Sequence, residues 1–147
     1  MYYESYNQSL IIGYSPHASH SKINTHLMDY EKEVLVMQEK LELFWSIFED
    51  DKESAVEICS MFCSYVPELF NTIDEAISQQ DVETVKKTVH SLKGTLGYLG
   101  FEAENKQVVE LEESLEDSPL VDILQPYQEL KLHLESVVQM LSNEVLA

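Results

Sequence analysis

Residues 82–100 read VETVKKTVHSLKGTLGYLG, and this stretch decides the fold class. Its apolar side chains recur at steps of three and four residues, at Val82, Val85, Val89, Leu92, Leu96 and Leu99. This spacing is typical of an amphipathic helix with one buried stripe. Asp81 precedes the stripe, where an N-cap residue is preferred. Gly100 follows it, where a left-handed residue commonly closes a helix.

The same periodicity continues outward from this helix in both directions. It predicts further helices over residues 29–48, 52–78 and 101–117, and a last helix after Ser118-Pro119, where Ser would act as the cap. Pro67 predicts a bend in its helix. Pro126 allows two starts for the last helix: either the helix begins earlier and kinks after Leu124, or the long helix begins at Pro126. Short loops join neighbours antiparallel, so we expect an all-α, antiparallel up-and-down four-helix bundle with an additional N-terminal helix or arm.

Residues 1–28 show no sustained period, and we interpret them as an N-terminal tail or arm before a bundle domain over residues 29–147. This segment contains His17, His20 and His26. A His-x-x-His pair can bind a metal on a helix, but Pro16 and the flanking serines disfavour a helix there. We therefore favour a solvated histidine cluster and expect no metal.

Charge restricts the class of partner, because the chain has a net charge of −18 and its nine basic residues are all Lys. Phosphate backbones and anionic lipid would repel such a chain, so we expect neither nucleic acid nor membrane as a partner. The charge also favours a monomer. The N-terminus has no basic region before its short apolar run, and no stretch is long enough to span a bilayer, so we expect a cytoplasmic protein.

The two cysteines, Cys59 and Cys63, are four residues apart and share one helix face in the apolar register. We interpret them as small buried apolar residues. A disulfide or a zinc site is the less favoured alternative, because no second ligand pair is suitably spaced.

A polar face surrounds His90, on the side of its helix opposite the apolar stripe. On a helical wheel, its neighbours within about 60° are Lys86, Lys87, Lys93, Gly94 and Gly97. We therefore expect His90 to point out of the core, inside a local positive island that attracts an anion or an acidic pocket. Each glycine costs about 1 kcal/mol relative to alanine inside a helix, which suggests that open space is needed here. Tight helix packing is the alternative for the glycines, and ordinary solvation is the alternative for Lys86 and Lys87.

His90-Ser91-Leu92-Lys93-Gly94, followed by Gly100, resembles the signature of histidine phosphotransfer (HPt) domains, and also that of the phosphorylated domain of chemotaxis histidine kinases. The resemblance extends from about residue 41 to residue 146 and includes Pro67-Glu68-Leu69. Two positions depart from the family pattern. Val89 replaces a frequent alanine, and Glu116 stands where a basic residue is common.

The resemblance implies a phosphorelay carrier in which His90 accepts a phosphoryl group from a receiver-domain aspartyl phosphate and passes it to another receiver. Lys93 would stabilise the phosphate, and Glu112 would orient the imidazole, unless Glu112 is an ordinary exposed acid. Lys86, Lys87, Gly94 and Gly97 would form the docking surface. The partners would be response-regulator receivers and possibly a hybrid histidine kinase. No ATP-binding motif is present, so we expect a carrier that is not an enzyme and that needs no cofactor.

Two alternatives stay open at this point. One is a docking module that regulates a histidine kinase or response regulator without being phosphorylated. The other is a structural helical protein with metal bound by its N-terminal histidines, which leaves the grouping of Lys93, Gly94 and Gly97 unexplained.

Overall fold

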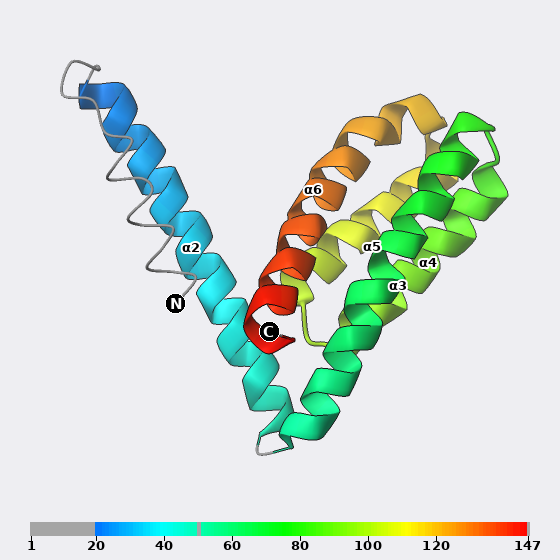
Figure 1. Cartoon of the computed structure of the whole chain (residues 1–147). Coiled ribbons are helices and arrows are strands. Elements are labelled where there is room, and N and C mark those ends of the chain that lie inside the picture. Colours follow the sequence, from blue (N-terminus) through cyan, green and yellow to red (C-terminus); the bar gives the residue numbers. More distant parts are fainter. Residues whose placement is uncertain (1–19, 50, 147) are drawn as a thin grey trace. The chain divides into compact units, whose positions relative to one another are not determined.

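The computed structural model of the chain describes residues 20–49 and 51–146, with side chains from Leu27 onward. Five helices and no strand are present in these residues. They are α2 (His20–Phe48), α3 (Lys52–Ser78), α4 (Val82–Tyr98), α5 (Glu102–Asp117) and α6 (Leu120–Val145) (Figure 1). The all-α prediction is confirmed.

Four of these helices form a closed bundle. α3 packs against α4, α4 against α5, α5 against α6, and α6 returns to α3 (Figure 1). Short connections join the four bundle helices α3 to α6, so neighbours within the bundle run antiparallel. The predicted up-and-down four-helix bundle with an additional N-terminal helix is therefore confirmed. The chain divides into two units after Glu42, and the bundle belongs to the second unit together with the last residues of α2.

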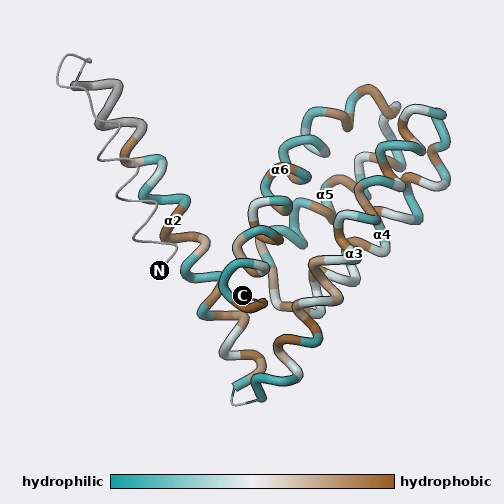
Figure 2. The backbone as a smooth tube through the Cα atoms, viewed as in Figure 1, coloured by the Kyte–Doolittle hydropathy of each residue, from teal (hydrophilic) through white to brown (hydrophobic). Residues whose placement is uncertain are grey.

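The apolar stripe of each bundle helix faces the shared core. The stripe of α4 is fully buried at Val85, Val89, Leu92 and Leu96, and the C-cap residue Leu99 is buried as well. Hydrophobic and hydrophilic segments alternate along each bundle helix, as the brown and teal parts of the tube show (Figure 2). Val82 was predicted to belong to the stripe, but its side chain is exposed. Val82 is the first residue of α4, where the helix follows the connection from α3.

Asp81 caps α4 as predicted, and Asp51, which the sequence also places just before a helix, caps α3. The Asp51 carboxylate accepts a hydrogen bond from the Ser54 N–H at 3.1 Å, and Asp81 accepts one from the Thr84 N–H at 3.2 Å. Hydrogen bonds from the Thr84 hydroxyl and N–H lower the pKa of Asp81. Gly100 has φ of +73°, the left-handed conformation predicted for the end of α4.

The N-terminal helix begins earlier than predicted. α2 starts at His20, so residues 20–28 are helical and the predicted arm is shortened. No Gly or Pro occurs between Pro16 and Pro67, so nothing local interrupts the helix before residue 29. The domain boundary after residue 28 stays a prediction, and the division into two units falls after Glu42. Residues 1–19 lie outside the described residues, as do the side chains of His17, His20 and His26.

The start of α6 also corrects a prediction. Ser118 ends α5 by donating its N–H to the Ser114 carbonyl at 2.8 Å, and Pro119 occupies the N-cap position of α6 without a side-chain cap. α6 then continues through Pro126, so a start at Pro126 is wrong. Ile123 and Tyr127, on either side of this proline, are 1% and 0% exposed. Burial of these two side chains offsets the backbone hydrogen bond that proline removes.

The cysteine pair lies on α3 against α6. Both thiols are free, with the Sγ atoms 3.9 Å apart. Cys59 is fully buried, as predicted, whereas Cys63 is only partly buried.

Candidate functional site

His90 stands on the outer face of α4. Its side chain is 70% exposed, whereas Val89 and Leu92 beside it are fully buried. The helix presents this contrast because its apolar stripe faces the core and His90 lies on the opposite side. The predicted orientation of His90 away from the core is confirmed.

Glu112 on α5 contacts two basic groups of α4 at once. Its Oε2 atom lies 3.3 Å from Nδ1 of His90, and its Oε1 atom lies 3.3 Å from Nζ of Lys93. An ionised carboxylate only accepts hydrogen bonds, so Nδ1 of His90 carries the hydrogen in this contact. In the neutral ring, Nε2 then keeps its lone pair. The structure thus brings together His90, Lys93 and Glu112, the three residues that the family resemblance implied for the site.

The predicted positive island around His90 is partly neutralised. Lys93 pairs with Glu112 at 3.3 Å, and Lys86 pairs with Glu116 at 3.7 Å. Of the three lysines on this face, two therefore lie beside carboxylates of α5. The helical period correctly predicted the face of α4 on which the lysines lie. It describes one helix, so it could not predict that carboxylates of α5 would lie beside these lysines.

The surface beside His90 is open at two glycines. Gly94 and Gly97 are exposed, and a Cβ atom added to either one would meet no atom of the described residues within 4 Å, apart from the adjoining backbone of α4 itself. Tight helix packing is therefore wrong as an explanation of these glycines. Their positions leave space for another molecule to approach the imidazole.

An exposed aromatic residue, which was not among the predicted site residues, lies on the same helix. Tyr98 follows Gly94 by four residues on α4, and it is 72% exposed. Its position outside the apolar stripe was the signal that could have identified it. A large exposed aromatic side chain is typical of a contact surface for another protein.

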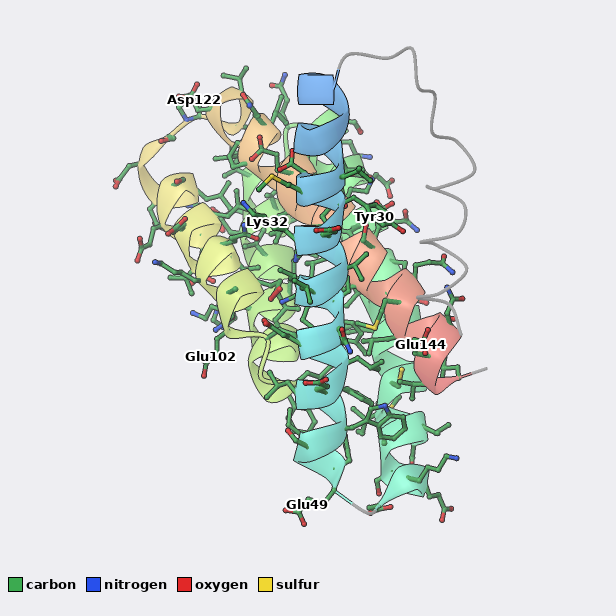
Figure 3. All side chains as sticks on the ribbon, turned by 90° about the vertical axis from the view of Figure 1, so that its left-hand side faces the viewer. Tyr30, Lys32, Glu49, Glu102, Asp122 and Glu144 are labelled. Atoms are coloured by element: carbon green, nitrogen blue, oxygen red, sulfur yellow. The ribbon has the colours of Figure 1, made fainter. Side chains whose placement is uncertain are left out.

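The outer surface of the bundle away from this face carries many acidic residues. Glu102 and Asp122, in the first turns of α5 and α6, project outward at opposite ends of the bundle (Figure 3). Among the described residues, no group of three or more His, Cys, Asp or Glu side chains could hold a metal ion. None of the described helices is both long enough and apolar enough to cross a bilayer.

Comparison with known proteins identifies the family. The sequence model of the Hpt domain matches residues 57–143, which contain His90 and the whole of α4 and α5. The chain is also similar to the crystal structure of the HPT domain from the Hpt sensor hybrid histidine kinase from Shewanella, with a TM-score of 0.60 and 25% sequence identity. That similarity covers 69% of this chain and 88% of the Shewanella chain. The search among curated proteins found no match. Since the family model spans more than half of the chain and includes the exposed histidine, the chain belongs to the Hpt domain family and has a histidine phosphotransfer role in a phosphorelay.

Proposed function

We propose that His90 accepts a phosphoryl group from the aspartyl phosphate of a receiver domain and passes it to a second receiver. The observation that carries this proposal is the exposed imidazole whose Nδ1 atom lies 3.3 Å from Glu112. This contact keeps the hydrogen on Nδ1 and leaves Nε2 available as the nucleophile.

The transfer forms a bond between Nε2 of His90 and phosphorus, and it breaks the bond between phosphorus and the aspartate oxygen. The released group is the aspartate carboxylate. The imidazole becomes positively charged when Nε2 forms this bond, and the Glu112 carboxylate next to Nδ1 stabilises that charge. The receiver supplies the aspartate and any divalent metal that the reaction needs.

Lys93 acts on the phosphoryl group after a short movement. Its ammonium contacts Glu112 at 3.3 Å in a partly exposed pair, and such pairs contribute only about 0–1 kcal/mol. A phosphoryl group on His90 carries more negative charge than the Glu112 carboxylate. Lys93 follows His90 by about one helical turn, so its flexible side chain moves from Glu112 to the phosphoryl oxygens at little energetic cost.

The docking surface for the receiver is the exposed part of α4 beside His90. Gly94 and Gly97 let the receiver backbone approach the ring, while Lys86 and Lys87 lie at the edge of the covered area. The chain carries the phosphoryl group without an ATP site of its own.

The test is labelling by a phosphorylated receiver. We expect acid-labile label on the wild type and none on His90→Gln. His133→Gln is the matched control, because His133 lies on α6 and contacts Glu104 at 3.1 Å, away from α4. Label that persists in His90→Gln would refute the assignment of His90. Equal regulation of a partner by wild type and His90→Ala would instead favour a docking module that is not phosphorylated.

A further inference from the structure

The seam between α4 and α5 carries a second pair beside the His90–Glu112 contact. Lys86 lies one helical turn before His90 on α4, and Glu116 lies one turn after Glu112 on α5. Nζ of Lys86 and Oε2 of Glu116 are 3.7 Å apart.

The acidic member of this pair is the one presented to solvent. The Glu116 side chain is 66% exposed, whereas the Lys86 side chain is 28% exposed. Their contact is longer than a hydrogen bond, so the Glu116 oxygens remain open to a further donor. An approaching protein therefore meets a carboxylate at this flank of the His90 face.

Any protein that reaches His90 also covers Glu116. A stable protein interface buries about 800 Å² on each partner, which extends well beyond one helical turn from its centre. A carboxylate covered in this way is costly unless the partner supplies a hydrogen-bond donor or a positive charge. The partner surface opposite Glu116 consequently needs a hydrogen-bond donor, and a basic side chain supplies both the donor and the opposite charge.

The other edge of the His90 face, away from α5, carries a positive charge. On the helical wheel, Lys87 and Lys86 fall on opposite sides of His90, and Lys87 is exposed on the side turned away from α5. The face is thus electrostatically asymmetric, with Lys87 on one side and Glu116 on the other. Such asymmetry fixes the orientation of a partner and excludes partners with the wrong charge.

We propose, on the basis of the phosphotransfer role proposed above, that Glu116 selects receiver domains that carry a lysine or arginine at the position of their docking surface that faces the Glu116 end of the α4–α5 seam. That basic side chain pairs with Glu116 when the aspartate meets His90. Glu116 is a specificity-determining residue in this arrangement, and it takes no part in the chemistry.

The test compares phosphoryl transfer from the labelled chain to the purified receiver domains of the host organism. The variants are Glu116→Gln, which removes the charge, and Glu116→Lys, which reverses it. The control is Glu129→Lys, which makes the same reversal at an exposed position on α6, the helix diagonal to α4. Each variant is first labelled on His90 with phosphoramidate, a small donor that needs no receiver, so that all rates refer to the same labelled fraction.

For the receiver that the wild type phosphorylates fastest, we expect the rate to fall in Glu116→Gln and to fall further, by about tenfold or more, in Glu116→Lys. The loss should shrink in about 1 M salt, where the Debye length is only about 3 Å. Glu129→Lys should follow the wild type.

A Glu116→Lys rate that equals the Glu129→Lys rate, or that exceeds the wild-type rate, would overturn the inference. These outcomes leave the phosphotransfer proposal intact, because that proposal fails only when His90 takes no label from a phosphorylated receiver.

Discussion

Replacing Gly94 with alanine should stabilise the protein. Gly94 lies inside α4 and is exposed, and outside the backbone of α4 no described atom lies within 4 Å of the position where a Cβ would stand. The substitution therefore adds no clash, while it removes the entropic cost of glycine in a helix, about 1 kcal/mol. For a unit of this size, the midpoint of thermal unfolding should rise by roughly 5 °C.

Gly100→Ala is the matched comparison with the opposite sign. Gly100 has φ of +73°, and a Cβ there would stand 3.2 Å from Cδ1 of Ile47. Both the left-handed backbone and the close contact oppose a side chain, so we expect a loss of about 1 kcal/mol or more. Thermal and urea unfolding followed by circular dichroism would measure both changes. A Gly94→Ala variant less stable than wild type would refute the conclusion that the fold itself does not need this glycine.

The functional consequence of the same position can be separated from its effect on stability. Gly94→Leu restores helix propensity but places a bulky side chain one turn from His90. Transfer from a phosphorylated receiver should therefore slow much more than labelling by phosphoramidate, which is small enough to pass. An equal effect on both donors would show that Gly94 does not govern the approach of a protein partner.

Three further predictions concern single contacts. Glu112→Ala should slow the labelling of His90 by a phosphorylated receiver. Glu112→Gln should recover part of the rate, because its amide oxygen can still accept a hydrogen bond from Nδ1. Equal labelling rates in both variants would contradict a role of Glu112 in orienting the imidazole. Tyr127→Phe should lower the free energy of unfolding by about 1–2 kcal/mol, because the Tyr127 hydroxyl donates to Asp74 at 2.6 Å, and urea titration would measure the loss. The pKa of Asp81 is lowered by the Thr84 hydroxyl and N–H, so its stabilisation is present above the ordinary aspartate pKa and is lost as the pH falls through the lower folded value. Thermal unfolding from pH 7 down to about pH 2 should therefore show Asp81→Asn less sensitive to acid than wild type.

Much of the fold could be predicted because its signals are local. The period of the apolar residues defined each bundle helix, and α3 spans residues 52–78 as expected. Asp51 and Asp81 marked helix starts because their carboxylates satisfy free N–H groups of the first turn. The orientation of His90 followed from the same period, since a residue opposite the stripe of a packed helix faces solvent.

The errors occurred where tertiary contacts outweigh local preference. Pro126, the seventh residue of α6, suggested a helix start. Ile123 and Tyr127 on either side of it are buried, and their burial stabilises a continuous helix through the proline. The family resemblance placed Glu112 beside His90, but the pairing of Lys93 and Lys86 with carboxylates of α5 was not predicted. A helical wheel describes one helix, whereas Glu112 and Glu116 reach the lysines of α4 from α5.

The register of the α4–α5 hairpin explains why these pairs meet, and it depends on the turn at Gly100. His90 lies ten residues before Gly100 and Glu112 twelve residues after it, so at 1.5 Å per residue the two lie nearly level across the seam. Lys86 and Glu116 lie fourteen residues before and sixteen residues after the same glycine, and they are level for the same reason. Because both pairs depend on one turn, the His90–Glu112 contact and the Lys86–Glu116 contact share a single structural origin. The left-handed backbone of Gly100 therefore influences the site through the register of the hairpin, which places Glu112 opposite His90 and Glu116 opposite Lys86.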